Sequence, residues 1–133
     1  MDLIKQRGEK VGVFKDIAHK FKYSFQGFVH CFKNETSFTF EAIAVVGVII
    51  LGIILKISVP EWFFSILSIL MIMEIEFLNT GIEATVDMVT KEFHPLAKVA
   101  KDCGSAATCM ATFMALAINL YIFIPKIIDF FVK

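Results

Sequence analysis

The chain carries three long stretches of almost uninterrupted apolar positions. Residues 42–55 and residues 62–73 contain no charged side chain, and residues 103–125 run for 23 positions without one. A helix needs about 20 mostly apolar residues to cross a bilayer, so the third stretch is long enough by itself. The pattern predicts three membrane-spanning helices.

The first two stretches reach the thickness of a bilayer only by including charged residues at their ends. The first does so if its helix continues to Val59 while the Lys56 ammonium reaches back to the interface. The second does so only if its helix continues through Glu74 and Glu76. Ionisable groups within a membrane helix are costly and usually face a partner or a wet cavity, so the second span is the place to look for chemistry.

Composition favours this membrane class over a soluble helical bundle. The chain has 133 residues, of which 57% are hydrophobic, and its mean hydropathy is +0.73. An ordinary soluble domain is roughly 45–50% apolar. A helix of a soluble bundle should also show a polar face, and residues 42–55 and 106–118 show almost none.

The N-terminal arm has a different pattern, with one apolar and one basic side. Its apolar side chains recur at steps of three and four: Phe14, Ile17, Phe21, Phe25, Phe28 and Phe32. Polar and basic residues take the other side: Lys15, Lys20, Lys22, Gln26 and Lys33. Such a helix can lie in the plane of the membrane with its lysines toward anionic headgroups. The alternative is a helix whose apolar side packs on other protein.

The expected fold is therefore an all-α integral membrane protein, with residues 1–133 forming a single membrane domain. Its N-terminal amphipathic surface helix should cover about residues 12–34. Its spans should cover about residues 39–58, 61–90 and 100–125, and the second should extend into the cytoplasm.

The distribution of basic residues predicts the topology. Seven of the thirteen Lys and Arg residues precede the first span: Lys5, Arg7, Lys10, Lys15, Lys20, Lys22 and Lys33. Three more follow the second span: Lys91, Lys98 and Lys101. This bias places the N-terminus and the loop at 90–102 in the cytoplasm of a multi-pass cell-membrane protein. The charged start lacks an apolar core, so no cleavable signal peptide is expected. The formal net charge of zero gives no information about partners, and no nucleic-acid partner is expected.

Four polar residues form a stripe on the second span. On a helical wheel with Glu76 at zero, Asn79 falls at about −60°, Glu83 at about −20° and Asp87 at about +20°. Glu74 falls at about 160°, on the opposite face. Three carboxylates and one amide therefore form a line that runs from membrane depth toward the cytoplasm.

Two chemical roles suit this line. The deepest carboxylate could act as a general base on a hydroxyl buried at the interface. The shallower carboxylates could hold Mg²⁺, a hard cation that prefers oxygen ligands and usually keeps waters and phosphate oxygens. Lys101 lies where the third span begins and could contact a polyphosphate as a compact cation. No Walker-type sequence and no kinase glycine-rich loop is present. The alternative for the stripe is a helix end whose acids simply face water.

These residues resemble the prokaryotic diacylglycerol kinase family. The segment EFLNTGIEATVD at 76–87 fits the family signature E-x-x-N-[ST]-x-x-E-x-x-x-D. The resemblance extends to AKDCGSAA at 100–107 and NETSF at 34–38, and covers about residues 14–125. The runs HPLAKVAKD and IFIPK look most like the Gram-positive branch, whose members are mainly undecaprenol kinases.

The resemblance implies roles for individual residues. Glu76 matches the proposed general base, and Glu35 and Glu83 match the carboxylates that bind the Mg²⁺ of the nucleotide. Asn79 and Asp87 match signature positions that support the site. Positions that match nucleotide or phosphate contacts are Tyr23, Glu92, Phe93, His94, Lys101 and Asp102.

Two other positions bear on the resemblance. Glu41 matches a family acid to which we assign no role. Asp16 stands where some relatives have an arginine near the nucleotide, so Lys15 or Lys20 would have to serve there instead.

The resemblance implies a lipid kinase that transfers the γ-phosphoryl group of MgATP to a lipid alcohol from the bilayer. It also implies a homotrimer with sites at the protomer interfaces. Undecaprenol is the main expected substrate, giving undecaprenyl phosphate. Two alternatives stay open: a diacylglycerol kinase that makes phosphatidic acid, and a non-enzymatic membrane carrier that uses the acids for protons or cations.

Overall fold

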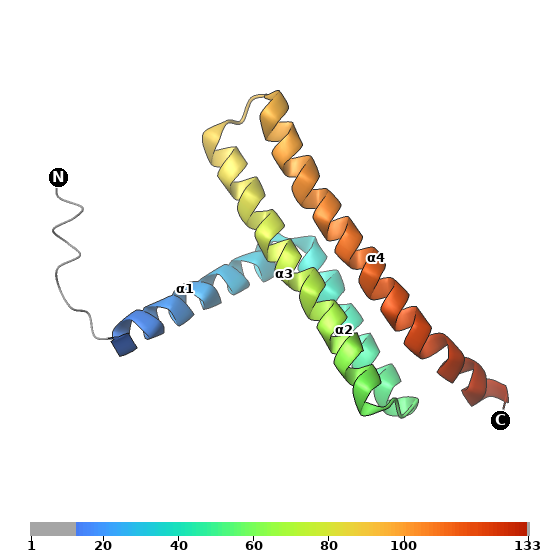
Figure 1. Cartoon of the computed structure of the whole chain (residues 1–133). Helices are drawn as coiled ribbons and strands as arrows, with labels where there is room; N and C mark the ends of the chain where they lie inside the picture. The colour runs from blue at the N-terminus through green and yellow to red at the C-terminus, as the bar shows by residue number, and fades with distance from the viewer. Residues whose placement is uncertain (1–12, 133) are drawn as a thin grey trace. The chain divides into compact units, whose positions relative to one another are not determined.

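The computed structural model describes residues 13–132, with side chains from residue 15 onward. In this range the chain forms four helices and no strand: α1 (Val13–Asn34), α2 (Thr36–Ile54), α3 (Val59–Val89) and α4 (Pro95–Val132). The chain divides into two parts, residues 1–34 and residues 35–133, and each part is described by itself (Figure 1).

Helix α1 covers the N-terminal segment that was predicted to have one apolar side and one basic side. Phe21 and Phe25 are exposed, and the rings of Phe28 and Phe32 pack with their centroids 4.5 Å apart. A position of this helix in the plane of the membrane stays a prediction. Three of the basic residues on which the predicted topology rests, Lys5, Arg7 and Lys10, lie outside the described residues.

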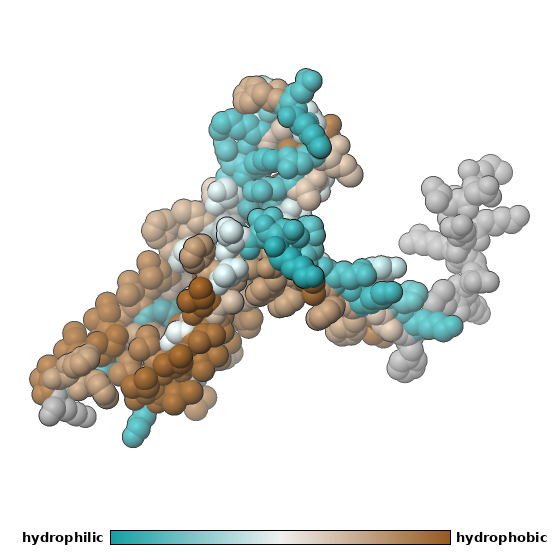
Figure 2. Space-filling view, turned by 180° about the vertical axis from the view of Figure 1, so that it is seen from behind, coloured by the Kyte–Doolittle hydropathy of each residue, from teal (hydrophilic) through white to brown (hydrophobic). Residues whose placement is uncertain are grey.

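Helices α2, α3 and α4 are each long and apolar enough to cross a membrane, with 19, 31 and 38 residues. Their exposed surface is largely apolar. Figure 2 shows the hydrophobic colours gathered over most of these helices, and hydrophilic colours toward the end that carries the α3–α4 loop. Large apolar side chains such as Ile53 and Phe113 are about two-thirds exposed, at 66% and 67%. A hydrocarbon environment accounts for this surface, because water would penalise it.

Helix α2 begins earlier and ends earlier than the expected range of 39–58. It starts at Thr36 and stops at Ile54, so the span reaches 19 residues without continuing past Lys56. The N–H of Ile57 donates to the Gly52 carbonyl at 3.1 Å, and the N–H of Lys56 donates to the Ile53 carbonyl at 3.3 Å. Lys56 has a φ of 49°. This is a Schellman ending, with lysine in the left-handed position that glycine usually takes.

Helix α3 has a well-defined start. The backbone N–H and the hydroxyl of Ser58 both donate to the Glu61 carboxylate, at 2.6 and 2.7 Å. Pro60 lies in the first turn, where its missing N–H costs no intrahelical hydrogen bond. The helix then runs without interruption through Glu76 to Val89, as the second span requires.

Helix α4 extends beyond both ends of the expected range of 100–125. It begins at Pro95, which suits a first helical position, and it continues through Pro125 to Val132. The helix therefore does not end at residue 125, where the third span was expected to end. A proline within a membrane helix is tolerated where neighbouring groups and local adjustments satisfy the freed backbone carbonyl.

Packing within residues 35–132 is dominated by the antiparallel pair α3 and α4, with α2 against α3 (Figure 1). Polar residues join the pair at membrane depth. The Asn119 amide donates to Ser68 Oγ at 3.0 Å, and Ser68 donates to the Ser65 carbonyl at 2.8 Å. Interhelical hydrogen bonds of this kind, together with small residues, hold membrane helices together.

Candidate active site

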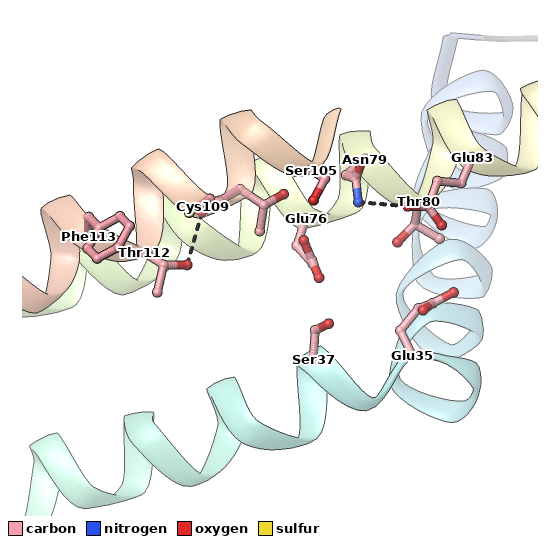
Figure 3. Close-up of a pocket in the computed structure, with 11 residues that line it drawn as sticks. Glu35, Ser37, Glu76, Asn79, Thr80, Glu83, Ser105, Cys109, Thr112 and Phe113 are labelled. Carbon is pink, nitrogen blue, oxygen red and sulfur yellow. Dashed lines mark hydrogen bonds between the residues drawn. The ribbon is translucent and has the colours of Figure 1, made fainter. Parts of the chain in front are cut away.

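A cavity of about 440 Å³ lies where α2, α3 and α4 face one another. Three acids of the chain, Glu35, Glu76 and Glu83, line it together with Asn79 (Figure 3). The helical spacing that aligned the polar residues of α3 therefore brings three of the four stripe residues to one wall. Glu35 comes from the other side: it is the residue before α2, and its side chain makes no capping hydrogen bond.

Glu76 is the most deeply placed acid of the cavity. It is 7% exposed, and its Oε2 has no hydrogen-bond partner among the described residues. In Figure 3 its carboxylate projects from α3 toward Ser37 on α2. Glu41 lies close enough to interact electrostatically with Glu76, and its own Oε2 is also buried without a partner. Buried polar groups are normally hydrogen-bonded, so the free oxygen of Glu76 is available to a group that enters the cavity.

Asn79 holds Glu83 in the wall of the cavity. Its Nδ2 donates to Glu83 Oε1 at 3.3 Å. Its Oδ1 is buried without a hydrogen-bond partner and lies against Gly104 of α4, where a Cβ atom would overlap it. Because Gly104 has no side chain, the Asn79 amide fits between α3 and α4 within hydrogen-bond reach of Glu83. Small residues such as Gly104 allow membrane helices to pack closely in this way.

Asp87, the fourth residue of the stripe, does not line the cavity. Its carboxylate pairs with Lys101 of α4, with Nζ and Oδ1 2.5 Å apart. Asp102, the next residue, pairs with Lys98 one turn earlier on the same helix. The two site residues predicted at the start of α4, Lys101 and Asp102, are therefore already paired with protein charges. They lie nearer to the α3–α4 loop than Glu83 does.

The loop between α3 and α4 contains three further predicted residues. Glu92 exchanges hydrogen bonds with the Thr90 side chain, and Phe93 is 82% exposed. His94 has a local structural role that the sequence did not suggest: its Nδ1 accepts the N–H of Leu96 at 3.2 Å and so caps the start of α4. His94 also lines a separate, mostly apolar cavity of about 380 Å³ with Val86. Whether these residues contact a nucleotide stays a prediction.

Tyr23 lies on α1, which belongs to the first of the two parts of the chain, residues 1–34. It is 64% exposed, and its ring lies near His19, with centroids 6.3 Å apart. Its assignment to the nucleotide therefore stays a prediction, as does the substitution of Lys15 or Lys20 for the arginine of some relatives.

Sequence reasoning missed most of the α4 wall. The cavity is also lined by small polar or aromatic residues: Ser37, Thr80, Ser105, Thr108, Cys109, Thr112 and Phe113. Ser105, Thr108 and Thr112 recur at steps of three and four, which places them on one helical face. That spacing was a usable signal. The hydroxyls of Thr108 and Thr112 donate to carbonyls of their own helix.

The donor set of the cavity suits a Mg²⁺ ion that arrives with a nucleotide. Among residues 13–132 no three His, Cys, Asp or Glu side chains come close enough together to hold a metal on their own. Mg²⁺ is usually bound by one or two carboxylates with waters and substrate phosphates. Glu35 and Glu83, on facing walls, supply that number of hard oxygen ligands. The cavity thus offers oxygen ligands of the kind that Mg²⁺ takes together with the phosphates of a nucleotide.

Comparison with known proteins extends this picture. Residues 22–123 match the family described as prokaryotic diacylglycerol kinase. The undecaprenol kinase of Bacillus subtilis is 38% identical over 127 residues, which is 96% of this chain and all of that protein. Two proteins named diacylglycerol kinase are also similar. That of Pseudomonas aeruginosa is 40% identical over 73% of this chain and 79% of its own length, and that of Escherichia coli is 36% identical over 70% and 76%.

Proposed function

Because the chain belongs to the prokaryotic diacylglycerol kinase family, we propose that it is an ATP-dependent lipid kinase whose main substrate is undecaprenol. The observation that carries the proposal is Glu76, a buried carboxylate with a free oxygen in a cavity that it shares with Glu35 and Glu83. Undecaprenol is preferred because the similarity to the B. subtilis undecaprenol kinase covers that protein's whole length.

In this proposal Glu76 is the general base. Its Oε2 accepts the proton as the lipid O–H bond breaks, and the lipid oxygen attacks the γ-phosphorus in line. The bond between that phosphorus and the bridging oxygen breaks, and ADP leaves with the electron pair. Phosphoryl transfer depends mainly on positioning and charge stabilisation, so few protein groups are needed. Glu35 and Glu83 hold the Mg²⁺ of the nucleotide, and Asn79 orients Glu83.

The nucleotide lies on the cytoplasmic side of Glu76 in this proposal. Lys101 contacts the phosphates, and Asp87 positions its ammonium through their ion pair. The other nucleotide contacts are assigned to Tyr23, Glu92, Phe93, His94 and Asp102. In this proposal the N-terminus and the α3–α4 loop lie in the cytoplasm, which the excess of Lys and Arg at those places supports.

We further propose that the protein acts as a homotrimer with sites at the protomer interfaces. The cavity of about 440 Å³ has the size expected for one drug-sized ligand, and both ATP and a lipid alcohol must be accommodated. Walls from a neighbouring protomer would complete the site. Native mass spectrometry of the detergent-solubilised chain tests this, and full turnover by a monomer would overturn it.

The general-base assignment is tested by Glu76→Gln. Loss of a positioned general base costs about 10²–10⁴ in rate, so turnover should fall by that factor while the thermal unfolding midpoint stays close to that of the wild type. Glu74→Gln is the matched control, because Glu74 lies on the same helix and is exposed. It should keep turnover within about twofold. Near-normal turnover of Glu76→Gln would refute the assignment.

Substrate preference is tested by phosphate transfer from labelled ATP in mixed micelles that contain undecaprenol or diacylglycerol. Preference for diacylglycerol would replace undecaprenol and leave the role of Glu76 unchanged. The carrier alternative predicts transfer to neither lipid and no thermal stabilisation by MgATP. A kinase should be stabilised by MgATP, because a ligand that binds only the folded state shifts unfolding to higher temperature.

A further inference from the structure

A second cavity lies at the end of the bundle opposite the candidate active site. Its volume is about 490 Å³, and it is lined by the end of α2 and the last turns of α4: Ile54, Leu55, Lys56, Lys126, Asp129 and Phe130. Glu76 and Lys126 lie on antiparallel helices, and Lys126 pairs with Glu61 in the first turn of α3. From Glu61 to Glu76 α3 rises by about 22 Å, so this cavity lies near the other face of the membrane.

The backbone at Lys56 is strained, which marks the position as more than a helix ending. With a φ of 49°, Lys56 occupies the left-handed region, which is unfavourable for an L-residue with a side chain but not for glycine. A cation there is favoured by the α2 dipole, but that effect does not require the left-handed residue itself to carry the charge. A non-glycine residue held in such a conformation is a reason to look for function.

The charges of this cavity are only partly paired. Lys126 Nζ lies 3.2 Å from Glu61 Oε1, so Lys126 is compensated. The side chains of Lys56 and Asp129 form no ion pair and no hydrogen bond with any residue in the described part of the chain. Among the described residues the cavity thus presents one ammonium, that of Lys56, and one carboxylate, that of Asp129, without a protein partner. Ile54, Leu55 and Phe130 make up its apolar lining.

We infer that this cavity binds the headgroup of phosphatidylethanolamine from the leaflet opposite the candidate active site. The lipid phosphate contacts the Lys56 ammonium, and the lipid ammonium donates hydrogen bonds to the Asp129 carboxylate. Its acyl chains follow the exposed apolar surface beside the cavity, where Ile54 is 52% and Phe130 56% exposed. A primary ammonium carries three N–H donors, whereas the quaternary ammonium of phosphatidylcholine carries none. Phosphatidylglycerol has no cation for Asp129.

The test is native mass spectrometry of the purified full chain in detergent with phosphatidylethanolamine, phosphatidylcholine and phosphatidylglycerol that carry identical acyl chains. Phosphatidylethanolamine should be retained at least about tenfold better than either other lipid, as expected when one charge-assisted hydrogen bond distinguishes them. Equal retention of the three lipids, or preference for phosphatidylglycerol, overturns the inference.

Two variants separate lipid binding from folding. Lys56→Gly removes the ammonium and suits the left-handed backbone, so it should retain phosphatidylethanolamine about tenfold less well while its unfolding midpoint holds or rises. Asp129→Asn should lower phosphatidylethanolamine to the level of phosphatidylcholine, while retention of the anionic phosphatidylglycerol should hold or rise because a like charge is removed. Lys91→Gln, which removes one charge from the exposed α3–α4 loop, is the control. Wild-type retention by Lys56→Gly overturns the inference.

Discussion

Gly104 of α4 lies directly against Asn79 of α3, and replacing it by alanine tests whether Asn79 orients Glu83 for Mg²⁺. A Cβ at Gly104 would overlap Asn79 Oδ1 and lie 3.3 Å from its Cγ and 3.8 Å from its Cα. The helix backbone is not forced apart at these distances, but the amide has to rotate. Rotation breaks the hydrogen bond of 3.3 Å from Asn79 Nδ2 to Glu83 Oε1.

The size of the effect follows from that hydrogen bond. A hydrogen bond to a charged group contributes about 1.5–3 kcal/mol, and 1.4 kcal/mol corresponds to a factor of ten. Gly104→Ala should therefore weaken the apparent affinity for Mg²⁺ by roughly 10–100-fold, the range seen when residues that orient metal ligands are removed. The free energy of unfolding should change little. Alanine is about 1 kcal/mol more favourable than glycine within a helix, and this gain offsets much of the cost of moving the Asn79 amide.

The assay is the initial rate of phosphate transfer at saturating ATP and lipid as Mg²⁺ is varied. Gly47→Ala is the matched control, since a Cβ at Gly47 meets no atom within 4 Å and Gly47 lies on α2, outside the cavity. It should leave the Mg²⁺ dependence unchanged. If Gly104→Ala shows the Mg²⁺ dependence of the wild type in folded protein, Asn79 does not orient Glu83 for the metal.

Three further predictions concern packing and the metal. In Gly52→Ala the new Cβ would lie 2.5 and 2.6 Å from two ring carbons of Trp62. We therefore expect about 1–3 kcal/mol of destabilisation and a shifted fluorescence emission from this single tryptophan. Unchanged emission and stability would contradict the packing of Trp62 against Gly52. Asn119→Leu loses the hydrogen bond to Ser68 and should destabilise the chain by about 0.6–2 kcal/mol in detergent unfolding, whereas increased stability would show that the bond contributes nothing. Removal of Mg²⁺ with EDTA should abolish phosphate transfer. It should not change the unfolding midpoint of the nucleotide-free protein, because in the proposed mechanism the ion arrives with ATP. A lowered midpoint would indicate a resident metal.

Much of the architecture follows from the linear order of residues. Long runs without charge specify membrane helices. In a helix the backbone groups hydrogen-bond to one another, and the apolar side chains can face the lipid. Helical geometry alone then aligns Glu76, Asn79 and Glu83, since residues three and four apart share a face. The family, in contrast, was inferred because the segment at 76–87 resembles a known signature, and that resemblance requires no knowledge of contacts.

Helix ends were less predictable, because they depend on local backbone states that residue types only bias. Lysine is not the residue expected in a left-handed ending, so nothing in the sequence indicated that α2 stops before Lys56. Proline usually ends a helix, yet α4 continues through Pro125. In both cases neighbouring groups override an intrinsic preference of about 1–3 kcal/mol.

The sequence by itself determined three candidate membrane spans, the family and one polar face on α3. Only the tertiary structure decided what that face meets: Glu35 and Ser37 across the cavity, and a wall of small polar residues on α4. The reason is that a periodic pattern specifies which residues share a face of one helix but not which face of another helix comes opposite. That choice is made by close contacts such as Gly104 against Asn79, which exist only when the helices pack.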